Sequence, residues 1–107
     1  MKIVFDKNDY KTYKQMYEDL AIKLGTSLGP KDYYDISTFD YDPNCLYEEL
    51  CYGKINKSSN HYVFKNFDLE KIKTEKSYDN YKYNLIIEVF QDFVKGYPNN
   101  TLEFIND

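Results

Sequence analysis

Three short apolar segments, separated by stretches with helical periodicity, constrain the fold of this chain more than any other feature. They are residues 2–5 (KIVF), 61–67 (HYVFKNF) and 101–105 (TLEFI), and Val63 and Phe64 lie at the centre of the second. Strands joined through helices pair in parallel, with right-handed crossovers. The order therefore predicts an α/β fold, in which a small three-stranded parallel sheet packs against helices. A chain of 107 residues fits one such domain, spanning 1–107.

The first long helix is predicted to begin after Thr12, which has with Gln15 the spacing of a capping box, while Asp9 is a competing cap. Gly25 is expected to end it. Ile22 falls outside the apolar face, which repeats at helical spacing. The residues predicted on that face are Tyr13, Met16, Tyr17, Leu20 and Leu24.

A second long helix is predicted over residues 79–95, with Gly96 closing it. Just before it, Asp68 can cap a shorter helix, LEKIK, whose apolar positions are Leu69 and Ile72. The apolar stripe predicted for the long helix comprises Leu85, Ile86, Val89, Phe90 and Phe93.

The middle of the chain combines a long loop with a short predicted helix. Residues 25–44 have a loop-like composition, and a loop of this length in a compact domain is usually functional or disordered. Its aromatic residues argue against plain disorder. A helix is predicted over residues 44–52, with Asp42 or Asn44 as its cap and Pro43 in its first turn. Leu46 and Leu50, four residues apart, should face the core.

Charge is segregated along the chain. Residues 32–53, here called the acidic segment, carry six carboxylates and no lysine, whereas the rest of the chain carries 12 carboxylates and 14 lysines. A local acidic field of this kind speeds encounter with a basic partner. The alternative is a solvated acidic loop without a partner. The six carboxylates are Asp32, Asp35, Asp40, Asp42, Glu48 and Glu49.

Several classes of function are disfavoured. The chain has no arginine, so forked contacts to nucleic acid are not expected. No apolar run approaches the ~20 residues that cross a membrane, and the N-terminus lacks the pattern of a secretory signal, so a cytoplasmic protein is expected.

Cys45 and Cys51 would point to different sides of one helix and are interpreted as reduced thiols. His61 alone cannot complete a zinc site, and no glycine-rich phosphate loop occurs, so no metal or cofactor is expected.

Tyrosines accompany the acids. Tyrosine offers broad contact area with a polar tip, and it is enriched at protein interfaces. The acidic segment is therefore interpreted as a recognition surface for a cationic site. An enzyme using Glu48 and Glu49 as acid and base is the alternative. Adjacent helical positions point about 100° apart, however, and the small chain leaves little room for a substrate cleft. No enzymatic activity is expected, and His61 is interpreted as structural.

The pattern over most of the chain resembles the barstar family, intracellular inhibitors of a secreted bacterial ribonuclease. TYKQMYEDLAIKLG, residues 12–25, resembles that family's first helix, and the pair Tyr33–Tyr34 lies where the family usually has a Tyr-Tyr pair. LYEEL, residues 46–50, resembles the Leu-Trp-Asp-Ala-Leu of its second helix. IIEVFQDF, followed by Gly96 and TLEFI, resembles its last helix and strand.

The resemblance implies roles for individual residues. In that family the second helix and the loop before it plug the nuclease active site, with carboxylates in place of the substrate phosphates. Glu48 then corresponds to the central aspartate and Asp92 to a peripheral glutamate. The family's second aspartate falls on Asn44 here, and the longer loop offers Asp42 as a replacement. The partner-binding residues implied in this way are Tyr33, Tyr34, Asp40, Asp42, Asn44, Tyr47, Glu48, Glu49 and Asp92.

The resemblance implies a protein inhibitor, an immunity protein of toxin–antitoxin type, that binds and blocks a basic secreted ribonuclease. It would be monomeric when free and would contact neither nucleic acid nor membrane directly. The alternative is an interaction domain of the same fold with a non-nuclease partner. The two differ in that a nuclease partner requires the acidic helix itself to be the contact.

Overall fold

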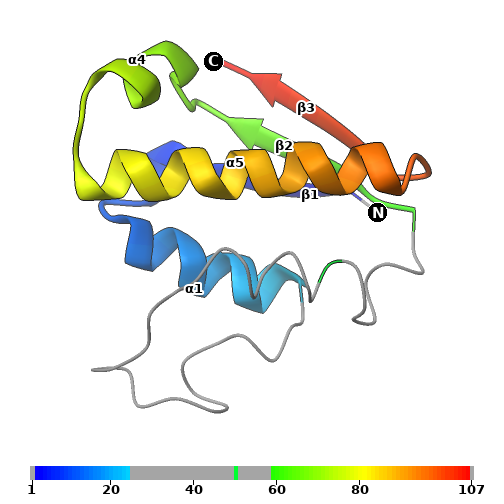
Figure 1. Ribbon diagram of the computed structural model, residues 1–107. Helices are drawn as coiled ribbons and strands as arrows, with labels where there is room; N and C mark the ends of the chain where they lie inside the picture. The colour runs from blue at the N-terminus through cyan, green and yellow to red at the C-terminus, as the bar shows by residue number, and fades with distance from the viewer. Residues whose placement is uncertain (1, 25–49, 51–58, 107) are drawn as a thin grey trace.

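The sheet has three parallel strands in the order β1–β2–β3. The structure, a computed structural model, describes residues 2–24, 50 and 59–106 (Figure 1). The strands are β1 (Lys2–Asp6), β2 (His61–Lys65) and β3 (Thr101–Ile105). The register places Val63 beside Val4 on one side and beside Glu103 on the other. The predicted α/β fold with a three-stranded parallel sheet is confirmed.

Helices connect the ends of the strands. A short 3-10 helix, η1 (Lys7–Asp9), and then α1 (Tyr13–Leu24) follow β1, while α4 (Leu69–Thr74) and α5 (Tyr78–Gly96) lead from β2 to β3. Figure 1 shows α5 lying across the sheet, with α1 on the same side and α4 at one end. The described fold is therefore two layers, helices on one face of a sheet.

The core lies between α5 and an aromatic face of the sheet. Alternate strand residues point to opposite faces, so Phe5, Tyr62 and Phe64 share one face with their neighbours across the strands. The ring of Phe90 on α5 lies 5.9, 5.0 and 5.1 Å from those three rings, centroid to centroid. These four side chains are fully buried. Such tilted ring pairs contribute about 0.5–1.5 kcal/mol each beyond the area that they bury.

The start and the buried face of α1 agree with the predicted pattern. Gln15 N donates to Thr12 Oγ1 over 3.3 Å, as in a capping box. The side chain of Gln15 accepts from Lys11 N over 2.7 Å, one residue earlier than in the standard motif. Ile22 is 77 % exposed. All five residues predicted on the apolar face are buried: Tyr13, Met16, Tyr17, Leu20 and Leu24.

The buried stripe of α5 is rotated from the predicted one. Leu85 is half-exposed, and Val89 only packs against the edge of the core. Gly96 is the last helical residue and does not adopt the left-handed conformation, so it does not cap the helix as glycine often does. The fully helical spacing i, i+3, i+4, i+7, i+10 selects the residues that are buried: Tyr83, Ile86, Ile87, Phe90 and Phe93.

The short helix and the last strand agree with the sequence. Asp68 caps α4, because its side chain accepts from Lys71 N over 3.0 Å, and Ile72 is buried. The strand predicted over 101–105 has the same bounds in the structure. The second strand ends at Lys65 rather than at residue 67.

Removing the Phe90 ring should destabilise the fold strongly. The Phe90→Ala variant leaves a cavity against β1 and β2, and truncations of this kind cost about 3–5 kcal/mol. Ile22→Ala is the matched control on an exposed helical position and should change the free energy of unfolding by about 0.5 kcal/mol or less. Denaturant unfolding followed by circular dichroism measures both. Equal losses in the two variants would contradict this packing.

Candidate functional site

Most of the residues predicted to bind a partner lie outside the described residues. Asp92 is the exception and is exposed on α5. The structure therefore does not show whether the others come together. Those outside the described residues are Tyr33, Tyr34, Asp40, Asp42, Asn44, Tyr47, Glu48 and Glu49.

Asp92 belongs to an acidic strip on the solvent side of α5. Phe90 and Phe93, on either side of it in the sequence, are fully buried, which turns Asp92 outward. Glu88 is exposed four residues earlier, on the same helical face, and accepts from Asn84 Nδ2 over 3.2 Å. Glu88 was not predicted from the sequence, although its i, i+4 spacing from Asp92 could have identified it.

Leu50 ties the acidic segment to the core. It is helical, fully buried and part of the cluster that includes the faces of α1 and α5. The prediction that Leu50 faces the core is confirmed. Leu46 and the rest of the helix predicted over 44–52 lie outside the described residues. Leu50, within the acidic segment, is thus fixed relative to the sheet.

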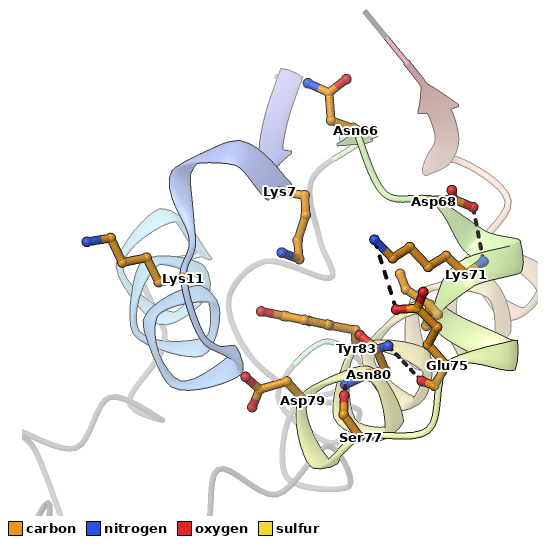
Figure 2. Close-up of a pocket in the computed structure, with 11 residues that line it drawn as sticks. Lys7, Lys11, Asn66, Asp68, Lys71, Glu75, Ser77, Asp79, Asn80 and Tyr83 are labelled. Carbon is orange, nitrogen blue, oxygen red and sulfur yellow. Dashed lines mark hydrogen bonds and ion pairs between the residues drawn. The ribbon is translucent and has the colours of Figure 1, made fainter.

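A pocket of about 390 Å³ lies at the carboxyl ends of β1 and β2 (Figure 2). Lys7 directly follows β1 and Asn66 directly follows β2, and the first turn of α5 closes the opposite side. Ligands of open α/β sheets bind outside the carboxyl ends of the strands. The lining residues are Lys7, Lys11, Asn66, Asp68, Lys71, Ile72, Glu75, Ser77, Asp79, Asn80 and Tyr83.

Tyr83 lies at the centre of this lining, with its hydroxyl directed into the space beside Lys7 (Figure 2). Its ring is buried and makes edge contacts with Tyr13 and Phe67. Lys7 Nζ lies 5.1 Å from the ring centroid, a cation–π contact. Burial, and secondly the Asp79 carboxylate, raise the pKa of Tyr83 to about 12. The hydroxyl therefore stays protonated at neutral pH and can donate a hydrogen bond.

Asn66 shapes the turn out of β2. Its φ of 63° lies in the left-handed region, which asparagine tolerates better than most residues. Asn66 N donates to Ile105 O over 2.8 Å, and Asn66 Nδ2 donates to Asp6 Oδ1 over 3.0 Å. That side-chain hydrogen bond, and one from Asn8 N, lower the pKa of Asp6. The turn explains why β2 ends two residues earlier than its apolar pattern predicts.

His61 links β2 to β3 on the other face of the sheet. Its Nδ1 lies 2.6 Å from Thr101 Oγ1 and its Nε2 lies 3.1 Å from Glu103 Oε1. The parallel register creates this line of hydroxyl, imidazole and carboxylate, because His61 pairs with Thr101. It lies apart from the pocket of Figure 2, and its contacts tie neighbouring strands together. They agree with the structural role that we expect for His61.

The described part of the chain contains no cluster of three or more His, Cys, Asp or Glu side chains that could hold a metal ion. Within the same residues, no helix has the length and apolar character needed to cross a membrane.

Comparison with known proteins found no family model, no curated protein and no solved structure that matches the chain. The resemblance to the barstar family therefore rests on the residue pattern alone.

Tyr83→Phe should reduce the loss of stability at alkaline pH. The unfolded chain releases the Tyr83 proton near pH 10, whereas the folded chain holds it to about pH 12. Between these values the unfolded state binds fewer protons, so the free energy of unfolding falls as the pH rises. Removing the hydroxyl should make this fall shallower. Denaturant unfolding at pH values from 8 to about 11.5 measures it, and an unchanged slope would contradict the burial of the hydroxyl.

Proposed function

We propose that the protein is an inhibitor of a basic ribonuclease, an immunity protein of the barstar type. The observation that carries the proposal is the segregation of charge: residues 32–53 hold six carboxylates without a lysine. The remaining residues are close to neutral, with 14 lysines against 12 carboxylates. The acidic field is thus confined to one segment of the chain rather than spread over all of it.

The fold supports the proposal because many of the residues that resemble the barstar family also build the core and the sheet of this structure. Met16, Tyr17, Leu20 and Leu24, which give the first helix its family-like spacing, are buried in the core. The last helix and strand also follow in the expected order, and β3 completes the parallel sheet. In the sequence, the acidic segment falls between α1 and β2, the interval in which the family has its inhibitory helix.

The chemistry of a ribonuclease explains why such a segment inhibits. A nuclease surrounds its phosphate site with lysines and arginines, and an uncleavable set of carboxylates competes with RNA for those cations. Attachment to a stable core reduces the entropy lost on binding, and Leu50 supplies one fixed point of attachment. Glu48, at the position of the family's central aspartate, would enter the phosphate site. Asp92, exposed on α5, would act at the rim.

The chain should inhibit RNA cleavage by a small basic secreted ribonuclease of the barnase type. Inhibition should be strong at low salt and weaker at about 0.5 M salt, because salt screens the attraction between opposite charges. It should be lost in Glu48→Ala and kept in Glu70→Ala, a control that removes an exposed carboxylate from α4. An RNA-cleavage assay measures inhibition by the unchanged chain and by the two variants.

Absence of inhibition at any salt concentration would contradict this proposal and favour an interaction domain with a non-nuclease partner. Equal weakening by Glu48→Ala and Glu70→Ala would show that net charge, rather than the acidic segment, accounts for the inhibition.

Glu48→Ala and Asp92→Ala should affect different rate constants. Truncating a buried charge at the centre of an interface costs about 2 kcal/mol or more, so dissociation should accelerate roughly 30-fold or more. Removing a rim charge weakens steering instead, so Asp92→Ala should mainly slow association, and more at low salt. Stopped-flow fluorescence or surface plasmon resonance measures both constants. A slower association in Glu48→Ala with unchanged dissociation would reverse these assignments.

A further inference from the structure

The pocket of Figure 2 is separate from the proposed inhibitory surface. Its lining comes from residues 7–11 and 66–83, and none of those residues belongs to the acidic segment or to the acidic strip of α5. Its volume, about 390 Å³, lies within the roughly 300–1,000 Å³ of ligand sites in proteins. An inference about this pocket therefore does not rest on the proposed function.

Two opposite charges in the pocket have no ionic partner among the described residues. Lys7 makes its cation–π contact with Tyr83 but no ion pair, and Asp79 makes neither an ion pair nor a side-chain hydrogen bond. The two groups do not pair with each other either, although both line the same space. Figure 2 shows Lys7 pointing down toward Tyr83, with Asp79 at the lower margin. Both side chains are only partly exposed.

The other charges of the lining are already engaged or point elsewhere. Lys71 Nζ pairs with Glu75 over 3.9 Å, and Asp68 accepts from Lys71 N as the cap of α4. In Figure 2 the side chain of Lys11 extends away from the centre of the pocket. Within the described part of the lining, one cation and one anion, Lys7 and Asp79, are thus left to meet a ligand.

We infer that this pocket binds a small zwitterion of the α-amino acid class. The ligand carboxylate would accept hydrogen bonds from Lys7 Nζ and the Tyr83 hydroxyl, and the ligand ammonium would donate to Asp79. A ligand of one sign would leave one of the two protein charges opposed or unpaired in a half-enclosed site, which is unfavourable. A zwitterion satisfies both.

The remaining lining favours a neutral polar side chain on that amino acid. Asn66 and Ser77 line the pocket, whereas Ile72 is the one aliphatic residue among the described residues of its lining. The ring of Tyr83 is buried, so it offers no exposed face on which an aromatic ligand could stack. Serine, threonine, asparagine and glutamine are the amino acids of this chemistry.

Isothermal titration calorimetry of the full chain with each of these four amino acids tests the inference. At least one should bind at millimolar concentration or tighter. Its N-acetyl derivative lacks the ammonium and its carboxamide derivative lacks the carboxylate. Each derivative should bind roughly tenfold or more weakly than the parent, because each loses a charge-assisted contact.

Paired variants assign each ligand charge to its protein partner. Lys7→Gln should weaken binding of the parent amino acid, which should then bind no more tightly than its carboxamide derivative. In Asp79→Asn, the parent amino acid should bind no more tightly than its N-acetyl derivative. Lys14→Gln and Glu70→Gln remove exposed charges outside the pocket and should leave binding unchanged. Circular dichroism and thermal unfolding confirm that each variant is folded before titration.

Binding that follows this pattern supports the inference. Absence of binding by all four amino acids would overturn it, as would derivatives that bind as tightly as the parent. Equal weakening of amino-acid binding in the pocket variants and in the control variants would overturn it too, because the ligand would then not contact Lys7 and Asp79. None of these outcomes bears on ribonuclease inhibition, so the two proposals fail separately.

Discussion

Burial of the aromatic face of the sheet against α5 holds the described fold together, because three strands of five residues are too short to be stable by themselves. Phe90 lies against rings from β1 and β2, and Phe93 extends the same contact to Tyr62 and Tyr97. Parallel strands need a crossover that returns the chain to the same end of the sheet, and α5 belongs to the crossover from β2 to β3. That geometry also brings Lys7 and Asn66, far apart in the sequence, to one edge.

The elements with regular periodicity were predictable from the sequence, and those that depend on tertiary contacts were not. Alternation identified β3 to the residue, and the spacing from Tyr13 to Leu24 identified the buried face of α1. The predicted end of β2 was wrong because the left-handed turn at Asn66 is stabilised by Ile105, which lies far along the sequence. The stripe of α5 was misplaced because Tyr83, a polar-tipped residue, is buried while Leu85 is not.

The candidate sites divide in the same way. A charge count along the chain is enough to identify the acidic segment, and the sequence alone suggests its partner. The pocket at the strand ends cannot be identified by counting, because its lining is assembled from two separate stretches by the parallel register. The rule that ligands bind at the carboxyl ends of parallel strands would have pointed to Lys7 and Asn66. The two candidate sites differ in their charge. The acidic segment carries one sign of charge, whereas the pocket is lined by both signs.

Hydrogen–deuterium exchange of the chain, alone and saturated with a small basic secreted ribonuclease of the barnase type, tests most directly whether the acidic segment is the contact surface. Binding through that segment predicts slower exchange in residues 32–53 and around Asp92, with little change in β3 or in the lining of the pocket. Slower exchange confined to the sheet face that carries His61 and Glu103, with residues 32–53 unchanged, would contradict it.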